Sequence, residues 1–345
     1  MVSFPKMRRL GIALLAFAFA ILPARAADEP KDILNASFDV ARELYTDIGA
    51  AFMKSYKEKN GVEIIVNKSF GGSSKQAKSI VDGVAADIAT MNQETDITFL
   101  VDNGLVNKDW RTRLPDNAAP FSSTIVFLVR KGNPKGIKDW ADLIKPKVEL
   151  IVPNPKTSGN GRYTYLAAYA YALKANKDVD PKETDAKAKE FVSALFKNVV
   201  VMDTGGRAAT TTFTNRTVGD VLLSFENELL FITKTQSPGE YEVVYPSISI
   251  QAELPVAVVD KIVDGRGSRK LATAYADYLW SEDAQRIGVK YFYRPRNAKV
   301  IEESKDLFGN IPLAKIDDVF GGWTKAFKTH FDKGGYFDQI FIEKK

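Results

Sequence analysis

The sequence predicts an α/β fold with two lobes and mostly parallel sheets, on three observations. Short β-branched or apolar runs alternate with helical patterns, and a polar Gly/Ser/Thr loop stands between strand and helix, which is the order of βα units in a parallel sheet. The chain of 345 residues, 45% of them hydrophobic, can bury the core of two domains. A late strand, after a full α/β unit, indicates that the chain crosses between lobes more than once.

The expected elements follow in a regular order. Runs rich in Val, Ile and aromatic residues predict strands, which cover 64–70, 123–134, 148–155, 198–204 and 255–264. Helical patterns follow these strands and begin at Ser73, 162 and 271, with a last helix over 324–331. The sequence has no repeat of fixed period, so solenoids and propellers are not expected.

The first 26 residues have the pattern of a secretory signal. Three cations precede an apolar run over 10–22, and a small-residue pattern ends at Ala26. This run is too short to span a bilayer, so we expect a signal peptide over 1–26 that is cleaved after Ala26. Without the four cations of this segment, Lys+Arg falls from 48 to 44 against 43 acidic residues, which removes the support for nucleic-acid binding.

The chain has no cysteine and one histidine, His330. Disulfides, thiolate catalysis and Cys/His zinc sites are therefore excluded, and we expect no metal site and no cofactor. An enzyme with Ser73 or Ser158 as nucleophile is one alternative, but its base would be His330, which we expect on a helix surface. Ferric-ion binding by Tyr291 and Tyr293 is another, although clustered tyrosines more often serve packing.

Four loops ahead of expected helices share one chemistry. They are SFDVARE, with Asp39 as the expected helix N-cap, FGGSSKQ, KTSGNGR and DTGGRAATTT. Ser73 and Gln76 have the spacing of a capping box. Free N–H groups at the positive ends of helix dipoles hold anions, and ligands of open α/β sheets bind outside the carboxyl ends of the strands. The loops lack the nucleotide-phosphate motifs GxxxxGK[ST] and GxGxxG.

With these loops the chain resembles the periplasmic sulfate/thiosulfate-binding proteins of ATP-binding-cassette importers, over essentially its whole length after the leader. The resemblance is carried by SFDVARELY, FGGSSKQA, RLPDNAAPFSSTIVFLVRKGNPK, PNPKTSGNGRYTYLAA, DTGGRAATTTF, VGDVLLSFENE, YFYRPRN and FGGWTK. It implies a type II periplasmic binding protein with two lobes that close around one sulfur oxyanion. It also implies a periplasmic location and an importer permease and ATPase as partners, with the permease contacted directly. We expect a monomer without a membrane anchor.

The resemblance also implies which residues contact the ligand. The contacts are backbone N–H groups, two serine hydroxyls and one aromatic position, and they fall on Asp39, Ser73, Ser158, Gly159, Asn160, Gly206 and Phe225. Asn160 and Phe225 depart from the sulfate-binding branch, which has glycine and an indole-donating tryptophan there, and look more like the thiosulfate-binding branch. Arg42, Arg162 and Arg207 lie in or just after the loops and either support them or are solvated surface residues.

The lobe boundaries follow from the order of the elements. We expect lobe one over 27–122 and 256–297, and lobe two over 123–255 and 298–345. The crossings near Ser123 and Leu254 would then be hinges.

Overall fold

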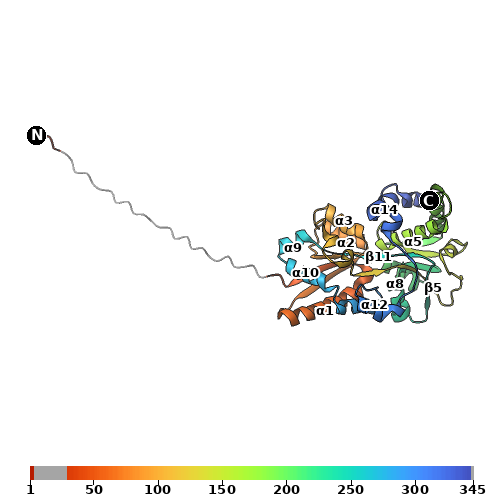
Figure 1. Cartoon of the computed structure of the whole chain (residues 1–345), viewed down its shortest axis with the longest axis horizontal. Helices are drawn as coiled ribbons and strands as arrows, with labels where there is room; N and C mark the ends of the chain where they lie inside the picture. Colours follow the sequence, from red (N-terminus) through yellow and green to blue (C-terminus); the bar gives the residue numbers. More distant parts are fainter. Residues whose placement is uncertain (4–28, 343–345) are drawn as a thin grey trace.

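The computed structural model describes residues 1–3 and 29–342. The expected signal peptide and its cleavage after Ala26 lie outside the described residues, apart from residues 1–3. In the described part, no helix is both long and apolar enough to cross a bilayer. Two main sheets flanked by helices form two lobes side by side (Figure 1), which confirms the expected α/β fold class.

The sheet of lobe one has four strands in the order β12-β3-β1-β2. Strand β1 is parallel to β2 and β3, and only β12 is antiparallel to its neighbour. The strands are β1 (Asp32–Phe38), β2 (Ile65–Gly71), β3 (Ile88–Thr90) and β12 (Val256–Val258). The helices are α1 (Arg42–Asn60), α2 (Ser73–Val81), α3 (Glu94–Asp102), α9 (Asp260–Arg266), α10 (Arg269–Tyr278) and α11 (Glu282–Lys290). Helices α1 and α10 pack on one face, and α2 and α3 on the other.

The sheet of lobe two has five strands in the order β7-β6-β8-β5-β9. All of them share one direction except β5, which is antiparallel to both its neighbours. The strands are β5 (Ile125–Arg130), β6 (Leu150–Pro153), β7 (Val199–Asp203), β8 (Val221–Phe225) and β9 (Tyr241–Val244). The helices are α5 (Gly159–Ala175), α6 (Pro181–Lys197), α7 (Gly206–Thr214) and α8 (Glu226–Phe231). The central strands are buried on both faces, which explains their continuous apolar sequences.

Three crossing segments join the lobes. Strands β4 (Phe121–Ser123) and β11 (Ala252–Leu254) form an antiparallel pair, and Ser122 also bridges to Arg294 of the third crossing. In Figure 1, β11 lies between the helices of the two lobes. Both expected hinge positions fall in this pair, so we propose it as the hinge. The lobe boundaries stay a prediction. The expected boundary at 297/298 would separate α11 from α12 (Ala298–Ser304), although these two helices pack together.

The C-terminal segment returns over α5 and reaches lobe one. It contains α13 (Ile316–Phe320), α14 (Trp323–His330) and α15 (Tyr336–Ile342), and β13 (Leu313–Ala314) pairs with β10 (Ser249–Ile250). Trp323 packs edge-on against Tyr163 of α5, with ring centroids 5.0 Å apart, and α14 also contacts α3. Short turns complete the chain at Asp39–Ala41, Trp110–Thr112, Pro115–Ala118 (α4), Trp140–Ile144, Ile232–Gln236 and Lys305–Leu307.

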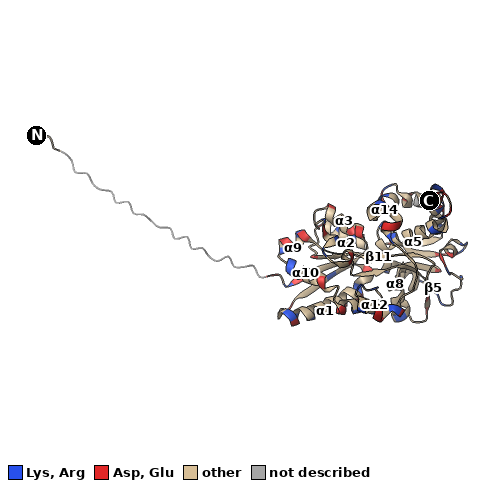
Figure 2. Cartoon of the chain, in the orientation of Figure 1, with Lys and Arg blue, Asp and Glu red and all other residues tan. Residues whose placement is uncertain are grey.

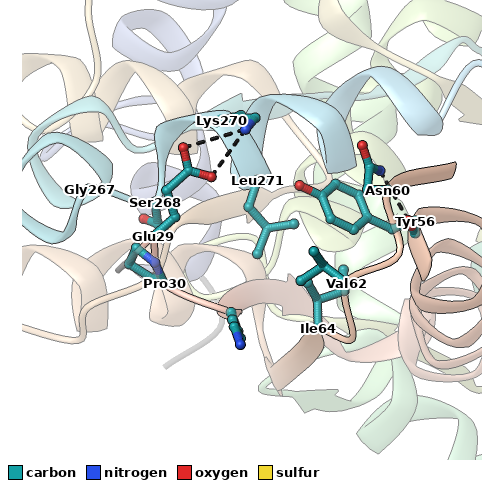
Figure 3. A pocket seen from close by; sticks show the side chains of 11 residues that line it. Glu29, Pro30, Tyr56, Asn60, Val62, Ile64, Gly267, Ser268, Lys270 and Leu271 are labelled. Carbon is teal, nitrogen blue, oxygen red and sulfur yellow. Dashed lines mark hydrogen bonds and ion pairs between the residues drawn. The ribbon is translucent and has the colours of Figure 1, made fainter. Parts of the chain in front are cut away.

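Acidic and basic residues are interspersed over both lobes (Figure 2), in keeping with the near balance of charges after residue 26. A pocket of about 290 Å³ lies between the end of α1 and the start of α10. Figure 3 shows the ion pair between Lys270 and Glu29, two of the residues that line the pocket. Their charged atoms lie 3.2 Å apart, and both side chains are exposed. Exposed pairs of this kind contribute little, and none of the predicted ligand-binding residues lines this pocket.

Candidate functional site

The predicted ligand-binding residues all follow the carboxyl ends of parallel strands. Asp39 follows β1, Ser73 is the first residue of α2 after β2, and Ser158 precedes α5 after β6. Gly206 is the first residue of α7 after β7, and Phe225 ends β8. Strands that run in one direction place these ends at the same edge of each sheet, which is where ligands of open α/β sheets bind.

The loops of the two lobes meet at this edge, as the glycines show. A methyl group on Gly72 of lobe one would lie 3.3 Å from the Thr157 carbonyl oxygen of lobe two. A methyl group on Gly159 would lie 1.9 Å from Asn92 Oδ1, and one on Gly205 would lie 2.5 Å from Asp39 Oδ2. The two lobes therefore approach each other closely at these three glycines, where an added side chain would require neighbouring atoms to move.

Asp39 does not cap its own helix, contrary to the expectation from SFDVARE. Phe38 stands at the N-cap of the short turn after β1, and no side-chain cap is made there. The Asp39 carboxylate instead accepts the N–H of Val40 at 3.0 Å and the N–H of Arg207 at 3.2 Å. Burial raises the pKa of Asp39, while these two N–H groups act in the opposite direction. Asp39 therefore caps α7 of the other lobe.

The expected capping box of Ser73 and Gln76 is also absent. Gly72 stands at the N-cap of α2, and no side-chain cap is made. The buried Ser73 hydroxyl accepts the N–H of Asn92 at 3.1 Å, and Gln76 donates to Ser69 Oγ at 3.1 Å. The N-cap residue of α2 therefore makes no side-chain hydrogen bond to the N–H groups at the start of this helix.

The start of α5 contains three predicted contacts, and each is buried. Ser158 is the N-cap and makes no side-chain capping bond. The Asn160 side chain donates from Nδ2 to Ser224 Oγ at 2.8 Å, and Ser224 is the residue before Phe225. Its Nδ2 would lie 2.7 Å from a methyl group on Gly206. Asn160 therefore connects the starts of α5 and α7 with the end of β8.

The three arginines occupy different positions. Arg162 is buried and donates to Ser74 Oγ at 3.0 Å, and its guanidinium lies 3.7 Å from Asp96. Burial lowers the pKa of Arg162, and Asp96 opposes this effect. Arg42 is exposed and stacks over the Phe70 ring, so of the two alternatives it fits the surface residue.

Arg207 bonds carboxylates of both lobes. Its guanidinium donates to both Glu43 oxygens of lobe one at 2.9 Å, and its Nε lies 2.8 Å from Glu228 of lobe two. Burial raises the pKa of Glu228 to about 7, although Arg207 lowers it. The side chain of Arg207 is therefore fixed between carboxylates, while its own N–H is held by Asp39.

Sequence reasoning missed the segment after β3. Asn92 and Gln93 precede α3 in lobe one and are buried against Gly159 at the start of α5. The side-chain oxygens Asn92 Oδ1, Gln93 Oε1 and Asn160 Oδ1 have no hydrogen-bond partner. Apart from Phe225, the contacts implied by the resemblance are all hydrogen-bond donors, so these acceptor oxygens are an addition to the site. The signal was present, because MNQE follows the apolar run IAT and precedes a helix in the same strand–polar–helix order as the predicted loops.

A cavity of about 1000 Å³ opens outside the meeting loops. Asp39, Gly72, Thr157 and Thr204 are among the residues that line it, together with the aromatic rings of Phe99 and Phe327. Thr157 Oγ1 donates to the Thr204 carbonyl at 3.1 Å. Ser73 and Ser158 are buried and do not line this cavity.

The groups needed by the two alternative functions are engaged elsewhere. His330 is buried, not on a helix surface as expected, and its Nδ1 lies 3.1 Å from the Tyr165 hydroxyl. Burial lowers the pKa of His330 to about 4. Tyr293 is buried and donates to the Val40 carbonyl, whereas Tyr291 donates to Asp47. The base and the paired phenolates that those functions require are therefore not assembled.

Comparison with known proteins places this geometry in a family. The family model for bacterial extracellular solute-binding proteins matches residues 36–294. The chain is 52% identical to the thiosulfate-binding protein of Pseudomonas aeruginosa over 97% of this chain and 99% of the relative. It is 49% identical to the sulfate-binding protein of Salmonella typhimurium, over 93% of this chain and 97% of the relative.

A solved structure agrees with both sequence relatives. The sulfate-binding protein of Mycobacterium tuberculosis superimposes with a TM-score of 0.78 at 31% identity, and the match covers 88% of this chain and 100% of that structure. The type II two-lobed fold expected from the resemblance is thereby confirmed. The chain belongs to the bacterial extracellular solute-binding protein family, as a relative of proteins named for thiosulfate and sulfate binding.

Proposed function

We propose that the chain binds sulfate or thiosulfate in the periplasm and delivers it to an ATP-binding-cassette importer. The observation that carries this proposal is the meeting of the α2, α5 and α7 N-termini between the lobes. Relatives that match nearly the full chain are named for these two anions. The protein would act as a monomer without a membrane anchor, contact the permease directly, and catalyse no reaction.

A dianion between these loops would be held by neutral donors. The proposed contacts are the N–H groups of Asp39, Gly159, Asn160 and Gly206 and the hydroxyls of Ser73 and Ser158. Helix N-termini and charge-assisted hydrogen bonds stabilise anions without a cationic side chain in contact. The guanidiniums of Arg162 and Arg207 fit a supporting role, because both are engaged with carboxylates or hydroxyls.

Selectivity against phosphate would follow from the same donors. Near neutral pH phosphate keeps a proton more often than sulfate does, and a proton that faces another donor loses a hydrogen bond. Calorimetric titration of the emptied protein at pH 7 is therefore expected to show tight binding of sulfate or thiosulfate and poor competition by phosphate. Equal competition by phosphate would mean that the buried amide oxygens accept its proton, and the donor-only explanation would be wrong.

Thiosulfate preference is the finer part of the proposal, and it rests on Phe225. Phe225 is fully buried and packs edge-on against Tyr163, with ring centroids 5.9 Å apart. A phenyl ring donates no hydrogen bond, and sulfur packs favourably against rings. Phe225→Trp should shift the ratio of the two affinities toward sulfate, and an unchanged ratio in calorimetry would contradict this assignment.

Two measurements distinguish anion binding from the two alternative functions, enzymatic turnover and iron binding. Mass spectrometry of the ligand released from the purified protein should identify a sulfur oxyanion. Thiosulfate recovered after long incubation should be chemically unchanged, because His330, the base that the enzyme alternative requires, is buried beside Tyr165. A coloured protein that releases iron would contradict the proposed function.

A further inference from the structure

Lys156 begins the KTSGNGR loop and lies two residues before Ser158. A lysine beside an anion site can attract the anion through its charge. The Lys156 ammonium, however, is held by the C-terminal segment. Nζ donates to the Phe331 carbonyl oxygen at 2.7 Å, lies 2.6 Å from Asp338 Oδ1 and stands 5.9 Å from the centroid of the Phe337 ring. Three groups of a segment about 175 residues further along the chain therefore contact this cation.

These partners are fixed by packing on α5. Phe331 and Phe337 are buried, and both rings pack edge-on against Tyr165 of α5, with ring centroids 5.2 Å and 6.0 Å apart. Buried aromatic rings contribute strongly to the packing energy of a core. Asp338 directly follows Phe337, so its carboxylate is positioned by a packed neighbour. The C-terminal segment therefore offers a fixed point of attachment to the loop before α5.

The loop connects Lys156 to the proposed N–H donors. Lys156 donates its own backbone N–H to Asn154 Oδ1 at 2.9 Å, which forms a tight turn at this point. The next residue, Thr157, donates from Oγ1 to the Thr204 carbonyl in the loop before α7. Gly159, the first residue of α5, follows two residues later. A displacement of Lys156 would therefore reach the proposed contacts of both loops.

The same C-terminal segment also reaches lobe one. Asp317 of α13 lies 3.6 Å from the Arg111 guanidinium, which pairs with Glu94 at 2.8 Å. Glu94 is the first residue of α3 and comes two residues after Asn92, which packs against Gly159. The C-terminal segment is therefore connected to both sides of this contact between the lobes.

We propose that Lys156 is a positioning residue, which holds the loop before α5 in its binding conformation through its contacts with the C-terminal segment. This role rests on the proposed function and adds the group that orders one of its ligand loops. A loop that is ordered in advance loses less conformational entropy on binding, so the affinity is higher. The ammonium acts on the protein and does not contact the anion.

Asp338→Asn separates this role from simple attraction between charges. The substitution removes a negative charge, which by electrostatics alone raises the affinity for a dianion. If Asp338 holds Lys156 in place, the same substitution lowers the affinity, so the two explanations predict opposite signs. Asp332→Asn is the matched control, because it removes the same charge from the same segment. Asp332 Oδ1 accepts the N–H of Lys333 at 2.8 Å, which asparagine can also do.

Calorimetry with sulfate and with thiosulfate at pH 7 measures the size of the effect. Partly exposed ion pairs correspond to up to about a fivefold change in an equilibrium constant. We expect about a two- to fivefold loss of affinity for Asp338→Asn and about a three- to tenfold loss for Lys156→Met, which also loses the bond to the Phe331 carbonyl. The double variant should bind no more weakly than Lys156→Met, since both changes remove one attachment. Asp332→Asn should lose no affinity.

Hydrogen exchange of the unliganded proteins tests the ordering of the loop directly. The amide hydrogens of residues 156–160 should exchange faster in Lys156→Met and in Asp338→Asn than in the wild type and in Asp332→Asn. The amide hydrogens of α14 should keep their wild-type rates, which a general loosening of the C-terminal segment would not allow. Thermal unfolding without ligand reports that each variant is folded.

Three results would overturn the inference. Asp338→Asn could bind the anions as tightly as the wild type or more tightly, Lys156→Met could bind both as tightly as the wild type, or the loop amides could exchange at wild-type rates in both variants. In each of these cases the wild type still binds, so the proposed function survives. Wild-type protein that binds neither anion would overturn the proposed function together with the inference.

Discussion

Alanine at Gly159 tests whether the lobes close around the ligand in the observed arrangement. The added methyl group would lie 1.9 Å from Asn92 Oδ1 and 2.9 Å from Asn92 Cγ. Non-bonded heavy atoms favour separations of about 3.5 Å or more, so the Asn92 side chain or its whole lobe must move by about 1.5 Å. The substitution keeps the backbone N–H of residue 159 and only obstructs the contact between lobes.

The expected magnitude follows from this crowding. Inserting a methyl group into a closely packed contact costs about 1–3 kcal/mol. A form with the lobes further apart avoids the cost, whereas a ligand-bound form in the observed arrangement can accept the methyl group only if the Asn92 and Gln93 side chains shift. At about 1.4 kcal/mol per tenfold change, the affinity for thiosulfate and sulfate should fall by about five- to 150-fold.

We do not expect Gly159→Ala to weaken binding by destabilising α5. Gly159 lies in α5 and has no positive φ, and alanine is a better helix former than glycine. Gly265→Ala is the matched control, because Gly265 also lies in a helix without a positive φ and a methyl group there meets nothing within 4 Å. Calorimetric titration gives the affinities, and thermal unfolding without ligand gives the stabilities. If Gly159→Ala binds as tightly as Gly265→Ala, the lobes do not close through the contact of Gly159 with Asn92.

Two further predictions concern charged groups outside the ligand contacts. Glu43→Gln removes the ion pair between Glu43 and Arg207, while Arg207 keeps its contact with Glu228. Partly exposed ion pairs contribute up to about 1 kcal/mol. The rate of ligand release should therefore rise by about two- to fivefold at low salt. Stopped-flow fluorescence should show the difference shrinking as salt rises, and equal release rates at low salt would count against this role. Burial lowers the pKa of His330 from 6.5 to about 4, so the folded protein favours the neutral imidazole. The free energy of unfolding is therefore unaffected by this group above about pH 6.5. It falls by up to about 3 kcal/mol as the pH drops toward 4, because protonation favours the unfolded chain. Urea unfolding across this range should therefore give a flatter pH profile for His330→Gln, and equal slopes would refute the assignment.

The strand–loop–helix order around 64–70, 148–155 and 198–204 came correctly from the sequence, because it depends on local patterns. The strand expected over 255–264 was wrong in its second half, since β12 ends at Val258 and α9 begins at Asp260. Apolar runs such as Leu150–Pro153 are typical of strands that are buried on both faces of a sheet, and α5 follows the polar loop after this strand as expected, although it begins at Gly159 rather than at 162. The resemblance extended this to the two-lobed fold. The short range of these signals is the reason they could be read without tertiary information.

The side-chain bonds of the site were not predictable in the same way. Asp39 was expected to cap its own helix and instead accepts from the start of α7 in the other lobe, because the observed arrangement of the lobes brings the Arg207 N–H to 3.2 Å from its carboxylate. Ser73 bonds the N–H of Asn92 rather than that of a capping-box partner. Both partners are distant in the sequence, and local spacing carries no information about them.

The sequence by itself determined the fold class and the absence of thiolate and Cys/His metal chemistry, because composition and periodicity are sufficient for both. Only the tertiary structure decided which groups meet between the lobes. It brought Asn92 against Gly159 and Asn160 against Ser224, and it buried His330 among aromatic rings of α5 and the C-terminal segment. The physical reason is that these contacts arise from how strands of separate segments align and how the lobes approach, which no local pattern encodes.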